Sequence, residues 1–90
     1  MIVLNGNPTL SDIELPIADD EQVEFWTSHN RYALRSIQDD SWHLFRVENS
    51  VQRITHHLHA RDREWVAAPT DVGRNVHAPS WRDALRRVVT

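Results

Sequence analysis

The sequence predicts an α+β domain: a small antiparallel sheet built on a central hairpin at about residues 31–49, covered on one face by a C-terminal amphipathic helix at about residues 80–89. Two observations carry this prediction. Apolar and polar residues alternate with period two on both sides of Asp39-Asp40, as they do in two strands joined by a tight turn. Near the C-terminus, apolar residues instead recur at the spacing of one helix face. A sheet and a helix with apolar faces bury them against each other.

The central hairpin is expected to have two distinct faces. Counting its loop as two or four residues pairs Ile37 with Trp42 and Arg35 with Leu44. Because side chains alternate along a strand, the face predicted to enter the core consists of Tyr32, Leu34, Phe45 and Val47. The opposite face is the predicted interaction surface, and it consists of Arg35, Ile37, Trp42, Leu44 and Arg46.

The C-terminal helix has its own start and stop signals. Ser80 followed by Asp83 is a capping pattern, and Arg86 and Arg87 suit the last turns because cations complement the helix macrodipole. The predicted apolar stripe consists of Trp81, Ala84, Leu85 and Val88. This stripe is expected to pack on the core face of the hairpin.

Residues 19–27 fit either secondary structure. Asp19 with Gln22 resembles a capping box and predicts a short helix. The alternation of Val23, Phe25 and Thr27 leaves a strand as the alternative.

Residues 50–60 are also ambiguous. Val51, Ile54 and Leu58 fall at helical spacing, which predicts a helix. The alternative is a third strand that continues the hairpin, because Ile54 and Thr55 are β-branched.

The remaining segments read as strand, loop and arm. Residues 64–68 are short and apolar and predict a strand, whereas residues 69–79 contain two prolines and Gly73 and predict a loop. Residues 1–18 contain an apolar run followed by Asn5-Gly6, which indicates a hairpin turn. Pro8 and Pro16 cannot donate to a strand ladder, so this segment is expected to be an edge hairpin or an irregular arm.

Length and composition indicate one domain spanning residues 1–90. Hydrophobic residues make up 40% of the chain, and no apolar run approaches the ~18 residues of a membrane span, so no membrane association is predicted. The chain has no cysteine, which removes disulfides and thiolate metal sites and fits a reducing compartment. Without a signal-peptide pattern, the expected location is cytoplasmic.

Charge is distributed unevenly along the chain. All ten basic residues are arginine, and the net charge is −3. Residues 1–30 carry six acids and no arginine, a charge of −6, whereas residues 31–90 carry ten arginines and seven acids, a charge of +3. Nucleic acid as a partner is therefore disfavoured overall, although Arg35, Arg46 and Trp42 could bind bases on a sheet surface.

Three histidines lie close together in the sequence: His56, His57 and His59. Imidazole is a common metal ligand, and His56 and His59 would share a helix face, whereas His57 and His59 would share a strand face. Their spacing matches no established metal motif, so no metal site and no cofactor are predicted. A small nuclease that uses one of these histidines is the enzymatic alternative.

The function that composition favours is a small non-catalytic protein-interaction or regulatory module, such as an adaptor, an antitoxin-like partner or a phage-inhibitor-like protein. Four tryptophans in 90 residues, together with arginine, match the residue types enriched at interface hot spots. The expected partner is another protein, which includes a second copy of the chain as a homodimer. The nucleic-acid-binding and histidine-dependent alternatives remain open.

Overall fold

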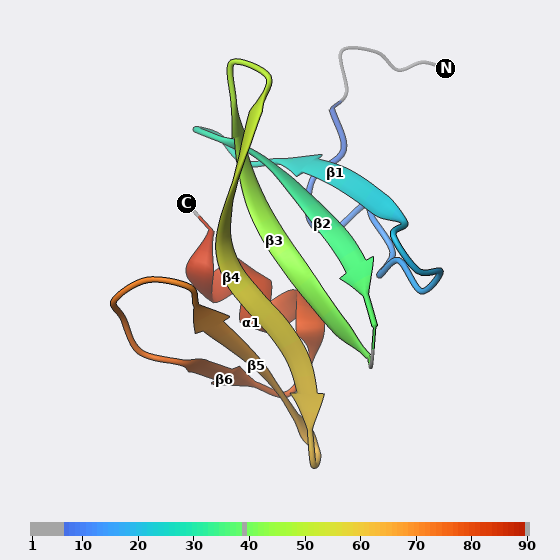
Figure 1. The fold of residues 1–90 in the computed structure, drawn as a ribbon, viewed down its shortest axis with the longest axis vertical. Helices are drawn as coiled ribbons and strands as arrows, with labels where there is room; N and C mark the ends of the chain where they lie inside the picture. The colour runs from blue at the N-terminus through green and yellow to red at the C-terminus, as the bar shows by residue number, and fades with distance from the viewer. Residues whose placement is uncertain (1–6, 39, 90) are drawn as a thin grey trace.

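The computed structural model describes residues 7–38 and 40–89, which form one antiparallel sheet and one helix (Figure 1). The strands are neighbours in chain order, so each pairs with the next through a hairpin connection. The elements are β1 (Gln22–Trp26), β2 (Arg31–Ile37), β3 (Ser41–Glu48), β4 (Val51–Arg61), β5 (Glu64–Pro69), β6 (Val76–Ala78) and α1 (Trp81–Val88). The predicted α+β class, with a C-terminal helix on an antiparallel sheet, is confirmed.

Two residues with left-handed backbone form the turn between β3 and β4. Asn49 and Ser50, with φ of 50° and 68°, connect β3 to β4. Two positive φ values match the right-handed twist of the flanking strands, which is why short hairpins favour them. Asp62, with φ of 55°, lies in the two-residue connection between β4 and β5. Asparagine and aspartate tolerate this conformation because their short side chains bond locally to the backbone.

Residues 50–60 form a strand, so the predicted helix there is wrong and the alternative is right. β4 pairs with β3 on one side and with β5 on the other. From His56 to His59 its backbone has strand neighbours on both sides, and an isolated helix of this length is marginal in water. One irregularity between Leu44 and Phe45 leaves Thr55 as an extra residue in β4, a β-bulge.

The segment 19–27 likewise contains a strand, β1, in place of the predicted short helix. β1 pairs with β2 over its whole length, with Phe25 opposite Tyr32. Their rings stack at 5.5 Å between centroids, and Phe25 is fully buried. The strand that the alternation of Val23 and Phe25 indicates is therefore correct, and the helix that the capping pattern at Asp19 indicates does not form.

After β4, the structure departs from the predicted secondary structure at one point. The strand expected at residues 64–68 is confirmed as β5, but the predicted loop at 69–79 contains the three-residue strand β6. In α1, the hydroxyl of Ser80 accepts a hydrogen bond from the backbone N–H of Asp83 at 3.1 Å, as the capping pattern predicts. Ala84 and Leu85 are fully buried where the helix packs mainly on β5 and β6, and not on the core face of the central hairpin as the sequence predicts.

The segment before β1 is an irregular arm, defined here as residues 7–20. It forms no strand, only an isolated bridge between Thr9 and Trp26, so the edge hairpin is not formed by its described part; residues 2–4 lie outside the described residues. Leu10 and Ile13 of the arm are buried. The guanidinium of Arg82 donates to the carbonyls of Leu10 and Ile13, at 3.2 and 2.7 Å, which ties the arm to α1.

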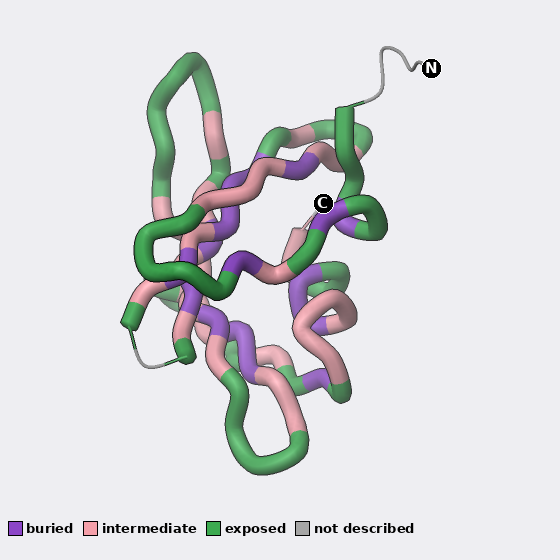
Figure 2. Tube along the Cα trace, turned by 90° about the vertical axis from the view of Figure 1, so that its right-hand side faces the viewer, coloured by how far each residue is buried: buried purple, intermediate pink, exposed green. Residues whose placement is uncertain are grey.

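The core lies on the side of the sheet that faces the arm and α1, here called the inner face. Figure 2 shows the buried positions gathered between the sheet and the helix, with the hairpin loops exposed. The arm covers the β1–β3 part of the inner face, and α1 covers the β5–β6 part. The sheet residues of the core are Phe25, Tyr32, Leu34, Trp42, Leu44, Leu58, Ala67 and Ala78.

Candidate functional site on the outer face of the sheet

The register of the central hairpin differs by one residue from the prediction. Leu34 pairs with Leu44, and Ser36 pairs with Trp42. Three positions, 38–40, separate β2 from β3, and Asp40 adopts φ of 53°. Three-residue hairpin loops typically end in a residue with left-handed backbone. An odd loop length reverses the face of every residue in one strand relative to an even one, so the predicted pairing of Ile37 with Trp42 is wrong.

The five residues of the predicted interaction surface therefore do not share a face. Trp42 and Leu44 are core residues, with 6% and 0% of their surface exposed. Arg46 lies on the inner face because it pairs with Tyr32. Of the five residues, only Arg35 and Ile37 lie on the opposite side of the sheet. Phe45 and Val47, which were predicted to enter the core, lie on that side with them.

The side of the sheet opposite the arm and α1 is here called the outer face. In Figure 1 it faces the viewer, with α1 behind the sheet. Cross-strand pairing sets Arg35, His43 and His57 in one row across β2, β3 and β4, and His59 next to Val66 of β5. The half-buried side chains that characterise the outer face are Arg35, Ile37, His43, Phe45, Val47, Ile54, His57 and His59.

Arg35 is held flat against the outer face. Its guanidinium carbon lies 5.0 Å from the ring centroid of Phe45, within the range of a cation–π interaction. Its Nε and Nη2 donate to Oε1 of Gln22 at 3.1 and 2.8 Å, and Nη2 also lies 3.3 Å from Oε1 of Gln52. These partners are neutral, so the positive charge of Arg35 is not neutralised by them. A fixed, uncompensated guanidinium is a ready partner for a carboxylate.

Three histidines form a contiguous row beside Arg35. The ring centroids of His43 and His57 are 5.4 Å apart, and those of His57 and His59 are 5.5 Å apart. Burial lowers the pKa of His57 first, and the neighbouring charges of His43 and His59 lower it further. Nδ1 of His59 is buried and has no hydrogen-bond partner within the described residues.

The predicted histidine cluster is divided between the two faces. His57 and His59 share the outer face, as a strand requires, whereas His56 pairs with Leu44 on the inner face. Burial lowers the pKa of His56, and its Nδ1 lies 3.0 Å from the hydroxyl of Thr55. Among residues 7–38 and 40–89, no three His, Asp or Glu side chains are placed so that they could hold a metal ion.

His43 and Phe45 belong to this site, and the sequence analysis placed neither of them there. Both would have been found had the loop been counted as three residues. The signal available was an aspartate at position 40, because aspartate is among the residues that accept the left-handed conformation at the end of a three-residue loop.

Comparison with known proteins does not assign a function: no protein-family model, curated protein or solved structure matches this chain. Across the described ranges, no helix has the length and apolar character needed to span a lipid bilayer.

The lowered pKa values of His56 and His57 predict a loss of stability in mild acid. A histidine whose folded pKa lies below its unfolded value binds fewer protons in the folded state. The stability that the neutral histidines contribute is therefore fully present above about pH 6.5, the ordinary pKa of histidine, and is lost as the pH falls below that value. We expect the melting temperature to fall as the pH is lowered from about 7.5 to 5.5.

His57→Gln should flatten this pH dependence of the melting temperature, whereas His29→Gln, an exposed control, should leave it unchanged. An unaltered pH profile for His57→Gln would contradict this origin.

Proposed function

We propose that this protein is a small non-catalytic protein-interaction module that docks another protein on the outer face of its sheet. The observation that supports this is a sheet face with no helix or arm over it among the described residues. Aromatic and arginine side chains are enriched at protein interfaces, and Phe45 with Arg35 places both types at its centre. An adaptor, an antitoxin-like protein or an inhibitor acts through such a surface, and the cysteine-free chain suits a reducing, cytoplasmic setting.

The partner we propose has an acidic contact surface. The outer face carries Arg35 and the histidine row, and its own carboxylates are already engaged. Glu24 pairs with Arg31, and Glu64 pairs with His77 at 2.7 Å. A carboxylate that approaches the centre of the face therefore meets donors without a competing acid. A second copy docking face to face would bring two surfaces of the same positive character together, so the proposed partner is a different, acidic protein.

A second candidate is a module for single-stranded nucleic acid. The observation that favours it is the set of planar groups on an open sheet, because bases stack on aromatic rings and guanidinium planes. A net charge of −3 weakens the attraction of phosphate, which is why this candidate comes second. The enzymatic alternative is weaker still, because the strand separates His56 from His57 and His59.

The test compares charge reversal on the outer face with charge reversal elsewhere. Arg35→Glu reverses the central cation, and Arg63→Glu makes the same change in the exposed connection between β4 and β5. Proteins captured from the native host by the parent are purified, and their dissociation constants for the parent, Arg63→Glu and Arg35→Glu are measured by calorimetry. We expect Arg35→Glu to weaken binding at least 30-fold, or about 2 kcal/mol, without a change in circular dichroism.

The pH dependence of the same interaction is a further check. A carboxylate against His57 favours the protonated imidazole, so binding should tighten as the pH falls from 8 to 6. Equal affinity for the parent and Arg35→Glu would overturn the proposal. Salt-sensitive binding of single-stranded oligonucleotides that requires Arg35 and Phe45, with no protein partner, would put the second candidate first.

A further inference from the structure

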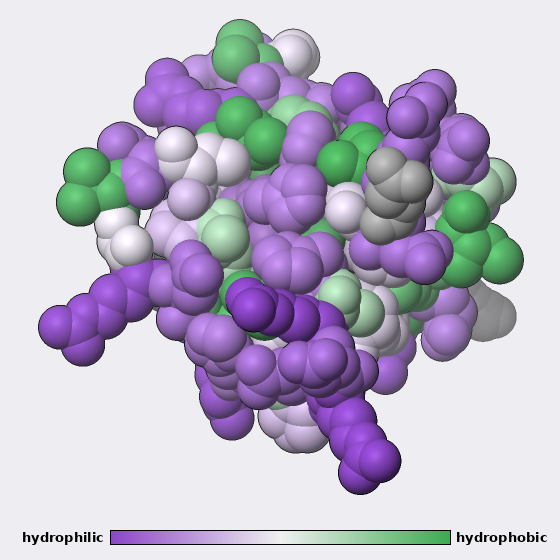
Figure 3. All heavy atoms as spheres, turned by 60° about the horizontal axis from the view of Figure 1, so that its bottom comes forward, coloured by the Kyte–Doolittle hydropathy of each residue, from purple (hydrophilic) through white to green (hydrophobic). Residues whose placement is uncertain are grey.

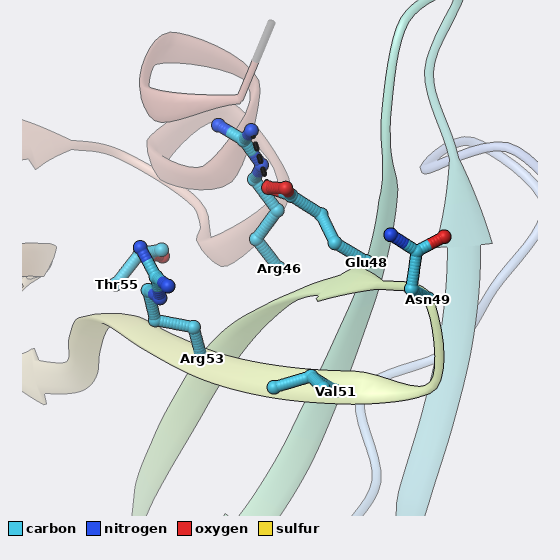
Figure 4. A pocket seen from close by; sticks show the side chains of 6 residues that line it. All are labelled: Arg46, Glu48, Asn49, Val51, Arg53 and Thr55. Atoms are coloured by element: carbon cyan, nitrogen blue, oxygen red, sulfur yellow. Dashed lines mark hydrogen bonds and ion pairs between the residues drawn. The ribbon is translucent and has the colours of Figure 1, made fainter.

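A pocket of about 330 Å³ lies on the inner face of the β3–β4 hairpin, away from the outer face (Figure 4). Its residues come from both strands and from the tight turn that joins them. The lining consists of Arg46, Glu48, Asn49, Val51, Arg53 and Thr55. None of these residues belongs to the predicted or proposed interaction site except Arg46, which the register moves to this side.

Two arginines face each other in this pocket. Arg46 and Arg53 are direct cross-strand partners, so their side chains leave the sheet on the same side. Like charges in directly opposite positions of an antiparallel pair destabilise it. The carboxylate of Glu48 pairs with Arg46 and offsets one of the two charges, as the dashed line in Figure 4 shows. Arg53 has no ion-pair or hydrogen-bond partner among the described residues.

We infer that Arg53 binds the carboxylate of a small aliphatic acid in this pocket. The two guanidinium groups and Glu48 give the pocket a formal charge of +1, which one further monoanion neutralises. A guanidinium binds a carboxylate through two parallel N–H···O bonds, the strongest geometry open to Arg53. Val51, with 61% of its surface exposed, gives the hydrocarbon part of the ligand an apolar wall. The side chain of Asn49 supplies a further amide donor at the rim.

This site is independent of the proposed function. Arg53 pairs with Arg46 on the inner face, whereas His57 and Ile54 pair with His43 and Phe45 on the outer face, because the bulge at Thr55 interrupts the alternation along β4. A substitution at Arg53 can therefore remove the carboxylate site and leave docking on the outer face intact. The failure of one proposal does not imply the failure of the other.

The experiment is a titration followed by nuclear magnetic resonance, with the Arg53 Nε–H and the Asn49 side-chain amide as reporters. The probe is butyrate, and matched titrations use inorganic phosphate and chloride at equal ionic strength. The variant is Arg53→Gln, and the control is Arg63→Gln, which makes the same change in net charge at an exposed arginine. The connection between β4 and β5, which contains Arg63, lies at the bottom of Figure 1, and Figure 3 brings this end forward and shows strongly hydrophilic side chains projecting there.

We expect saturable binding of butyrate with a dissociation constant of about 1–10 mM in the parent and in Arg63→Gln. Arg53→Gln should weaken it at least tenfold while its circular dichroism matches the parent. Shifts that do not saturate, or that persist in Arg53→Gln, would overturn the inference. Binding of phosphate in place of butyrate would also overturn it, because the ligand class would then be wrong.

Discussion

Replacing Trp42 with alanine is expected to lower the free energy of unfolding by about 3–5 kcal/mol. The indole is 6% exposed and lies 5.3 Å from the ring of Trp65, centroid to centroid. Its Nε1–H donates to the carbonyl of Pro16 at 2.6 Å, which joins the sheet to the arm. A domain of 90 residues has a total free energy of unfolding of roughly 5–13 kcal/mol. If this domain lies near the lower end of that range, the substitution would leave a large part of the population unfolded.

Urea denaturation at pH 7.5 measures this loss, and Trp42→Phe is the matched variant. Phenylalanine keeps an aromatic ring in the core but cannot donate to Pro16, so its cost should be smaller, about 1–3 kcal/mol. The sequence-based register placed Trp42 on a surface, where its loss would change stability by about 0.5 kcal/mol or less. A change of that size for Trp42→Ala would support the predicted register against the structural one.

The double substitution Leu10→Ala with Ile13→Ala is expected to cost about 4 kcal/mol or more. Both side chains lie in the arm and belong to the core cluster, with 7% and 5% of their surface exposed. Removing them leaves a cavity between the arm and the sheet that the surrounding chain can fill only in part. The two sites are neighbours, so their effects need not add, and each single variant should be measured too.

Ile17→Ala is the control for the arm, because Ile17 is 83% exposed in the same segment. Its effect should stay within about 0.5 kcal/mol. A double variant that unfolds at the same urea concentration as Ile17→Ala would show that the arm contributes little to the stability of the domain. Loss of stability in both would indicate that the arm responds to any change in its apolar content.

The elements with strong local signals were predictable from the sequence. The helix has both a capping serine and an apolar stripe, and its bounds differ from the expected range by only one residue at each end. The central hairpin was also placed well, but its register was not. Register depends on whether the loop holds two, three or four residues, and Asp39-Asp40 fits more than one length. A single residue of error therefore placed Trp42 on a surface and Phe45 in the core.

The two segments predicted as helices show the limit of local patterns. Three apolar residues at helical spacing in residues 50–60 are also compatible with a strand whose one buried face is interrupted by a bulge at Thr55. What decides between them is the presence of β3 and β5 on either side, which supply backbone partners along the strand. That information is in other parts of the chain, and no window of ten residues contains it.

The chain-order arrangement of the six strands has a consequence for the folding pathway. Every strand pair is a hairpin whose ends are close in sequence, so each can form with little loss of loop entropy and zip onto its neighbour. The contact between Arg82 and the Ile13 carbonyl joins residues that are 69 positions apart. Before the intervening sheet has formed, the entropy lost by closing so long a loop opposes this contact. We therefore expect the arm and the helix to meet only on a sheet that is already assembled, so that their contact forms late in folding.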